Sequence, residues 1–305
     1  MKKPTKDLFV PLEKDPFLEE KISQKSVSYW QDAWHRLKQN KIAMISLWIL
    51  LLFTLISIAG PSLSSYTYYE TFLEKKNLLP CREFWFGSDD LGRDIFTRIC
   101  YGARISLSVG CIAAFIDLII GVLWGGIAAL VGKRTDEIMM RIADILYAIP
   151  NLLIIILLML IMGSGIIPII ISLTITGWIN MSRIVRGQIL QLKRKEYVLA
   201  SIALGASFYR ILFKHLIPNI MGSIIVTVTL TIPSAIFIES FLSFLGLGIQ
   251  APIASWGTMA SEGLPALKYY PWRLFIPAIF ISSTMLAFNL LGDGLRDALD
   301  PRLRK

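Results

Sequence analysis

The chain has 305 residues, of which 54% are hydrophobic and 17% charged, and its mean hydropathy is +0.60. This composition is too apolar and too poor in charge for a water-soluble domain, and its hydrophobicity also excludes an intrinsically disordered chain. Lys and Arg number 31 against 22 Asp and Glu, for a formal charge of +9. That excess fits nucleic acid, an anionic membrane surface or an acidic partner protein, so its position along the chain must decide between them.

The N-terminal segment 1–41 carries charges of both signs and is too long and too acidic for the n-region of a signal peptide. We therefore expect a retained cytoplasmic tail. Its last part places aromatic and apolar residues on one helical face, namely Trp30, Ala33, Trp34 and Leu37. This pattern predicts an interfacial elbow helix in contact with membrane lipid.

Crossing a bilayer core of about 30 Å takes roughly 20 apolar residues as a helix. The uncharged stretch 145–182 is too long for one crossing, and Gly163-Ser164-Gly165 is the predicted turn within it. The predicted spans are residues 42–60, 105–131, 143–162, 166–182, 218–244 and 273–292. The sequence therefore predicts an all-α integral membrane protein with six transmembrane helices.

The positive charges predict the orientation of these helices. With the N-terminus inside, 23 of the 31 Lys and Arg residues fall on cytoplasmic segments and 8 on external ones, in accord with the positive-inside rule. We expect both termini in the cytoplasm, together with a loop over 183–217 and a C-terminal tail over 293–305. The segments 61–104 and 245–272 are then external. Because the charge excess serves mainly to orient the helices, we expect no nucleic-acid partner.

Catalytic and metal-binding patterns are weak in this sequence. Cys81, Cys100 and Cys111 form no CxxC pair, and the chain has two histidines, so we expect no metal site; a Cys81–Cys100 disulfide stays open as an alternative. Residues 126–133 resemble a phosphate-binding loop, but they have five residues between the glycines and Arg134 in place of Ser or Thr. We therefore expect neither a cofactor on this chain nor enzymatic activity.

The loop over 183–217 continues a helical pattern outside the bilayer. Apolar residues recur at helical spacing beside basic ones, with an interruption at Gly205 and an end at Pro218. The pattern predicts a helix, a glycine bend and a second short helix. Such an amphipathic loop could lie flat on lipid headgroups or insert into a groove of a partner protein, and both alternatives stay open here.

The same loop resembles the cytoplasmic signature of importer permeases of the ATP-binding cassette class. That signature pairs Glu-Ala-Ala with a Gly four positions later and a Pro thirteen positions after the Gly, and Ala200, Ser201, Gly205 and Pro218 fall on this spacing. Leu199 stands where the family has Glu, with Glu196 one turn earlier, and Ser201 replaces the second Ala. This departure removes the carboxylate from position 199 and leaves the glycine bend unchanged.

Four further stretches resemble one branch of that class, the second (C-type) permease subunit of oligopeptide and dipeptide importers. They are residues 29–44, 86–107, 239–257 and 291–304. The resemblance implies the fold of a type I importer permease in the bacterial inner membrane. It implies a heterodimer with a companion permease, two ATPase subunits that bind ATP, and an extracytoplasmic substrate-binding protein. The implied cargo is peptide; nickel or another small solute is the alternative, because related metal-ion importers share much of the pattern.

The resemblance also assigns a coupling helix over 198–209 that docks on an ATPase subunit. The residues implied in this coupling loop are Glu196, Leu199, Ala200, Ser201, Gly205, Arg210, Lys214 and Pro218. The apolar members can fill a groove, while Arg210 and Lys214 can meet acidic groups at its rim. A membrane channel, an assembly scaffold or an intramembrane enzyme is the alternative from a different class.

Two carboxylates lie at membrane depth, where they are costly and usually functional. Glu239 and Asp117 could line a translocation path, or each could be hydrogen-bonded to a neighbouring helix. In the external segments, a docking surface for the binding protein is predicted at Asp89, Asp90, Arg93, Asp94 and Trp256. For the aromatic residues there, an interfacial belt is the alternative.

Overall fold

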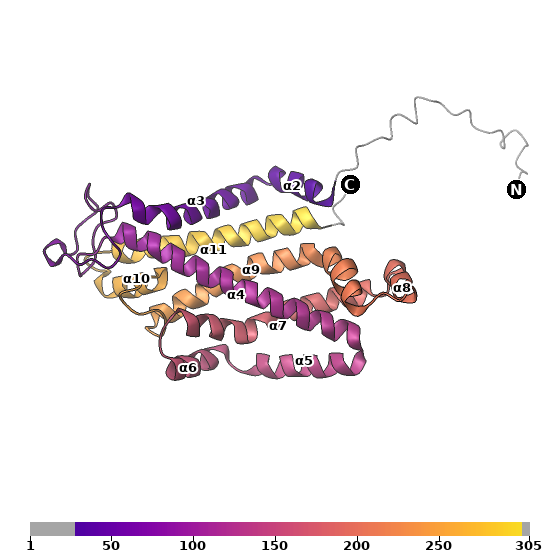
Figure 1. Cartoon of the computed structure of the whole chain (residues 1–305). Helices are drawn as coiled ribbons and strands as arrows, with labels where there is room; N and C mark the ends of the chain where they lie inside the picture. The colour runs from indigo at the N-terminus through magenta and orange to yellow at the C-terminus, as the bar shows by residue number, and fades with distance from the viewer. Residues whose placement is uncertain (1–27, 301–305) are drawn as a thin grey trace, which may run out of the picture.

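The computed structural model describes residues 28–300 and is helical almost throughout (Figure 1). The predicted segments 1–27 and 301–305 of the two tails lie outside the described residues. The helices are α2 (Tyr29–Gln39), α3 (Lys41–Leu63), α4 (Ile95–Val131), α5 (Lys133–Ala148), α6 (Asn151–Met162), α7 (Ile166–Leu192), α8 (Glu196–Ala203), α9 (Ile217–Phe244), α10 (Trp256–Gly263) and α11 (Trp272–Leu299). Short 3₁₀ turns occupy Leu73–Lys75 (η2) and Leu264–Ala266 (η4), and a π-helical turn (η3) occupies Arg210–Leu216.

Within the described residues, 5 helices are long and apolar enough to cross a membrane, or 6 if α5 and α6 together make one crossing. These two helices meet at a bend of 77°. Pro150 lies in the break, where its missing N–H and its restriction of Ile149 interrupt the helical hydrogen bonding. The prediction of an all-helical membrane protein is confirmed.

Several helices extend beyond the predicted spans. The side chain of Asp94 accepts hydrogen bonds from the backbone N–H groups of Phe96 at 3.2 Å and Thr97 at 3.1 Å, so α4 begins at Ile95, ten residues before the predicted span 105–131. Likewise α7 continues past the predicted span 166–182 to Leu192, and the added turns include Arg183 and Arg186. Hydropathy marks where a helix leaves lipid, whereas caps decide where it ends.

The second external segment contains a helix that its sequence did not indicate. The side chain of Ser255 accepts a hydrogen bond from the N–H of Thr258 at 3.2 Å, which begins the short helix α10. Trp256 is fully buried there, and its indole N–H donates to the carbonyl of Ile99 on α4 at 3.1 Å. The external part of the chain is therefore folded against the bundle.

The elbow helix α2 packs beside the last helix, α11. Ala33 and Leu37 are buried there, whereas Trp30 and Trp34 are half exposed on the outer side. The hydroxyl of Tyr29 donates to the carbonyl of Leu299 at 2.9 Å. The apolar face of this helix is thus divided between the bundle and its surroundings, and α3 and α11 lie side by side beyond it (Figure 1).

Helices α4 and α7 form the most extensive helix pair of the bundle. Their backbones approach so closely that a Cβ on Gly125 would lie 2.4 Å from the carbonyl oxygen of Ser182. Small residues allow such approaches in membrane proteins, where van der Waals packing drives helix association. Both helices of this pair also contribute side chains to the site described below.

We expect Gly125→Val to destabilise the bundle by several kcal/mol, since a backbone carbonyl cannot move away as a side chain can. The matched control is Gly187→Ala on α7, where a Cβ would meet nothing within 4 Å. That variant should be neutral or gain about 1 kcal/mol from helix propensity. Thermal unfolding in detergent measures both, and equal melting temperatures for the two variants would contradict the close approach.

Candidate functional site

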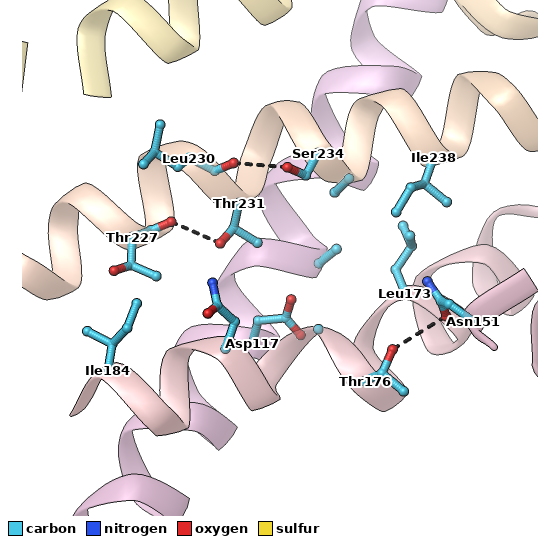
Figure 2. Close-up of a pocket in the computed structure, with 14 residues that line it drawn as sticks. Asp117, Asn151, Leu173, Thr176, Ile184, Thr227, Leu230, Thr231, Ser234 and Ile238 are labelled. Carbon is cyan, nitrogen blue, oxygen red and sulfur yellow. Dashed lines mark hydrogen bonds between the residues drawn. The ribbon is translucent and has the colours of Figure 1, made fainter. Parts of the chain in front are cut away.

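A cavity of about 360 Å³ lies between α4, α7 and α9, with α6 at one end (Figure 2). Polar side chains enter it from every one of these helices. They are Asp117 of α4, Asn151 of α6, Thr176 and Asn180 of α7, and Thr227, Thr231 and Ser234 of α9. Apolar residues complete the wall, among them Leu173, Ile184, Leu230 and Ile238. All these helices are candidate membrane spans or part of the bent pair, so the cavity lies at membrane depth.

Asp117 is the only charged residue among those that line the cavity, all of which the structure describes. It is 4% exposed, and its Oδ1 has no hydrogen-bond partner among the described residues. Gly177 of α7 makes room for this carboxylate, since a Cβ there would lie 2.1 Å from Oδ2. A buried, incompletely bonded carboxylate is costly in a protein interior and marks this wall as a candidate binding surface.

The cavity-lining hydroxyl groups of α9 already donate their hydrogens in hydrogen bonds within the helix. Thr227, Thr231 and Ser234 each donate to the backbone carbonyl four residues earlier, at 2.8, 2.9 and 3.2 Å. A hydroxyl has one hydrogen and two acceptor lone pairs, so these oxygens can offer only acceptors to the cavity. Figure 2 shows the bonds of Thr231 and Ser234 running along the helix. Together with Asp117, they make this wall rich in acceptors.

Glu239 occupies a different environment. It is fully buried and is absent from the cavity lining. Its carboxylate accepts hydrogen bonds from Ser106 of α4 and from Ser243 on its own helix, both at 2.9 Å, and from Ser240 at 3.4 Å. Of the two alternatives stated for Glu239, the structure has the one in which the carboxylate is hydrogen-bonded to a neighbouring helix, through Ser106 of α4. The serines one turn along α9 were the signal in the sequence.

The external residues predicted as a docking surface are mostly interior. Asp89, Arg93, Asp94 and Trp256 are each less than 5% exposed. Only the side chain of Asp90 is largely exposed, at 55%, and it pairs with Arg273 at 3.0 Å. The buried members therefore hold the external part of the chain together, which leaves them without surface to offer a protein partner.

These charges form a network that the sequence analysis missed in part. Asp89 pairs with Arg93 at 2.6 Å and with the buried Arg98, and Glu262 of α10 pairs with Arg93 at 2.9 Å and Arg98 at 2.7 Å. Burial alone would raise the pKa of Asp89, but the positive charges of Arg98 and Arg93 outweigh it and hold that pKa below its ordinary value. Arg98 was assigned to a loop, although its position one turn into a capped helix was a usable signal.

The predicted coupling loop is a knob that projects past the ends of α4 and α5 (Figure 1). Its helix α8 ends in a Schellman motif: the N–H of Ala206 donates to Ser201 at 3.0 Å and that of Gly205 to Ile202 at 2.9 Å. Gly205 has φ of +81°, which favours glycine. Val198 is fully buried among Val185, Ile189 and Leu212, and it fixes the knob to the bundle.

Most of the residues predicted for coupling are accessible on this knob. Glu196, Leu199, Ala200, Gly205, Arg210, Lys214 and Pro218 are exposed, and Ser201 is half-buried. The second helix of the loop differs from expectation, since it does not end at Pro218. Instead the π-helical turn η3 runs into α9 as one continuous helix from Arg210 to Phe244. Pro218 lies within the first turn of α9, where its missing N–H costs little.

Residues 121–305 match a family described as the binding-protein-dependent transport system inner membrane component. Residues 28–80 match the N-terminal TM domain of oligopeptide transport permease C. The chain belongs to this permease family. It is 61% identical to the oligopeptide transport system permease protein OppC of Bacillus subtilis, over 98% of both chains. It is 59% identical to the dipeptide transport system permease protein DppC of the same organism, over 93% of this chain and 89% of that protein.

A more distant relative is the oligopeptide transport system permease protein OppC of Escherichia coli K12, at 42% identity over 93% of this chain and 95% of that protein. Family membership confirms the predicted resemblance, the multi-pass location in the bacterial cell membrane and the type I architecture of this permease. The permease is a transport subunit and not an enzyme, as predicted. The cavity and the knob are therefore features of a transporter.

We expect Arg98→Met to destabilise the permease by about 3 to 5 kcal/mol, because it removes the more deeply buried of the two arginines that Asp89 and Glu262 share and leaves them Arg93 alone. Lys133→Met is the matched control: its partner Glu137 is 3.9 Å away, and both side chains are well exposed, at 90% and 65%. Such a surface pair contributes little. The measurement is the melting temperature of each variant in detergent. A similarly small decrease for Arg98→Met and Lys133→Met would contradict a structural role of the network.

Acid should weaken the same network. Because the folded pKa of Asp89 is below its unfolded value of about 3.9, its contribution to stability is present above that pH and is lost as pH falls through the folded pKa. Unfolding scans from pH 6 to about pH 2 measure this loss, which begins near the unfolded pKa. Asp89→Asn, which cannot titrate, should show a shallower dependence on pH than the wild type, and an unchanged slope would oppose the assignment.

Proposed function

We propose that this permease forms half of the membrane path of an ATP-driven peptide importer. A companion permease supplies the other half, two ATPase subunits bind and hydrolyse ATP in the cytoplasm, and an extracytoplasmic binding protein delivers the cargo. Peptide as cargo is supported by the relatives, two of which are named for oligopeptides and one for dipeptides. The cavity wall of hydroxyl, amide and carboxylate groups suits a ligand with many N–H donors.

The observation that carries the proposal is the knob formed by α8 and the Gly205 turn. Tyr197, Leu199, Ile202 and Leu204 expose apolar side chains there, although Val198 is fully buried. Tyr197 and Leu199 are two residues apart and point to nearly opposite sides of the helix, at about 100° per residue. A helix lying flat on lipid needs one apolar face. Apolar groups on two sides suit a groove that encloses the helix, as an ATPase subunit would provide.

Charge around the knob supports the same partner. Arg210 and Lys214 are exposed and four residues apart on η3, beside the apolar surface, while Glu196 begins α8. We infer that the cations meet acidic groups at the rim of the groove and set the docking orientation. Leu199 contributes apolar contact at the position where the wider family has a carboxylate, with 53% of its surface exposed.

On the outer side, we propose the cap of residues 64–94 as the face that receives the binding protein. Its buried ion pairs give it a fixed shape, and Asp90 is the predicted docking residue that remains accessible. Asp89, Arg93, Asp94 and Trp256 act in this proposal by holding that shape. The cavity wall that includes Asp117 is the proposed lining of the path, with Glu239 supporting the α4–α9 packing beside it.

We expect Leu204→Asp to reduce peptide import by at least about tenfold, because a buried charge would oppose docking in an apolar groove. Leu204 is 88% exposed, so the change leaves the fold intact. The matched control is Leu204→Met, which keeps an apolar side chain at the same position. The measurements are uptake of labelled trialanine in cells and ATP hydrolysis by the purified complex; ATP hydrolysis in Leu204→Asp should no longer respond to peptide-loaded binding protein.

A second variant, Gly205→Pro, tests the turn itself. Proline holds φ near −65° and cannot adopt the +81° found at Gly205, so the direction of the knob must change. Hydrolysis of ATP should become uncoupled from uptake while the protein stays in the membrane. Normal peptide uptake by both Gly205→Pro and Leu204→Asp would contradict the proposal. Peptide uptake in the absence of ATP would favour a channel instead.

A further inference from the structure

Three acceptor oxygens of α9 and the carboxylate of Asp117 line one cavity that contains no cationic side chain, and Oδ1 of Asp117 has no hydrogen-bond partner among the described residues. Each of these groups can accept a hydrogen bond, and none of the hydroxyls has a hydrogen left to donate. A ligand that complements this wall must therefore bring donors and positive charge. A primary ammonium group, with three N–H donors and one positive charge, meets both requirements.

We propose that Asp117 and the hydroxyl oxygens of α9 form a subsite for a primary ammonium group of the translocating peptide. This inference rests on the proposed function and names the part of the cargo that the cavity recognises. Two sources share this chemistry, the α-amino group of the peptide and the side chain of a lysine residue. The carboxylate gives a charge-assisted contact, and the hydroxyls take the remaining N–H groups.

The other buried carboxylate of the membrane region provides the structural contrast. Glu239 is surrounded by donors, with Ser106 and Ser243 each at 2.9 Å, and needs no ligand. Asp117 has a small neighbour, Gly177, where Glu239 has serines, and its Oδ1 lacks a partner. The same chemical group is thus satisfied by the protein at one position and left for a ligand at the other.

Asn151 limits where the rest of the peptide lies. The side-chain oxygen of Asn151 accepts from the hydroxyl of Thr176 at 3.4 Å, so its NH₂ group remains as a donor at the α6 end of the cavity. A peptide has carbonyl oxygens as well as an ammonium group, and an amide at a distance from Asp117 suits them. The cavity, at about 360 Å³, is near the lower limit for small-ligand sites, so it holds only the first part of a peptide at once.

The test uses the complete importer in proteoliposomes, with binding protein and ATP, and compares trialanine with N-acetyl-trialanine. Both peptides are delivered by the same binding protein, so its own preference cancels when the ratio of uptake rates is compared between wild type and Asp117→Asn. We expect Asp117→Asn to slow trialanine by about tenfold or more and to leave the acetylated peptide within about twofold. Asp117→Glu, which keeps the charge, should recover part of the trialanine rate.

Further arms identify the source of the ammonium group and separate binding from folding. N-acetyl-Lys-Ala-Ala should regain sensitivity to Asp117→Asn if a lysine side chain serves, and should lack it if the site takes the α-amino group alone. Thr231→Val removes one acceptor and should lower the trialanine rate a few fold. Thr174→Val is the matched control, since Thr174 makes the same bond along its helix, to Ile170 at 3.0 Å, away from the cavity lining.

The outcomes are distinct. Equal slowing of free and acetylated peptides by Asp117→Asn, or no slowing of trialanine, overturns the subsite and leaves Asp117 a structural or hydrating role. If the wild-type importer takes up trialanine but not the acetylated peptide, the two variants are compared on trialanine uptake alone. Uptake that is retained in Asp117→Glu and lost in Asp117→Asn supports the subsite. Equal loss of uptake in both variants overturns it. If the wild-type importer takes up neither peptide, the proposed function itself has failed.

Discussion

Buried carboxylates are the constraint on which the rest of this structure depends. An apolar surrounding cannot solvate such a group, so the protein must supply donors or cations, or leave the group for a ligand. Asp89 receives two arginines, and Glu239 receives serine hydroxyls. The first arrangement fixes the external cap and the second fixes α9 against α4. Asp117 receives neither, and the cavity forms around it.

Sequence reasoning predicted the class of fold well because the bilayer imposes it. A membrane-crossing backbone must satisfy its own hydrogen bonds, so uncharged stretches of sufficient length become helices almost regardless of detail. The predicted span 105–131 leaves out the first ten residues of α4, which include the charged Arg98 and Arg104. In the structure Arg98 is buried by ion pairs with Asp89 and with Glu262, and only the packing of α10 against α4 brings Glu262 to it.

The functional residues divide along similar lines. Gly205 was predictable, because a helix followed by glycine indicates a left-handed turn from local chemistry alone. Asp117 and Glu239 could not be distinguished from each other, since hydropathy records depth and not neighbours. Their difference comes from Ser106 and Gly177, which only the packing of α4 against α9 and α7 brings beside them, and from Ser243, one turn along α9 from Glu239. The acceptor-rich wall also depends on which hydroxyls bond to their own helix.

The two helices that enter the knob are the same helices that form the cavity walls. Helix α7 lines the cavity as far as Ile184 and ends at Leu192, about 12 Å further along its axis at 1.5 Å per residue. Helix α9 is continuous with η3 on the other side of the loop and reaches the cavity at Thr227. Val198 packs between these helices and closes the loop rigidly. In the proposed importer, movement of the ATPase subunit would therefore reach both walls through unbroken helix. The acceptors of α9 would shift relative to Asp117 on α4, so the geometry offered to an ammonium group would change with the state of the ATPase.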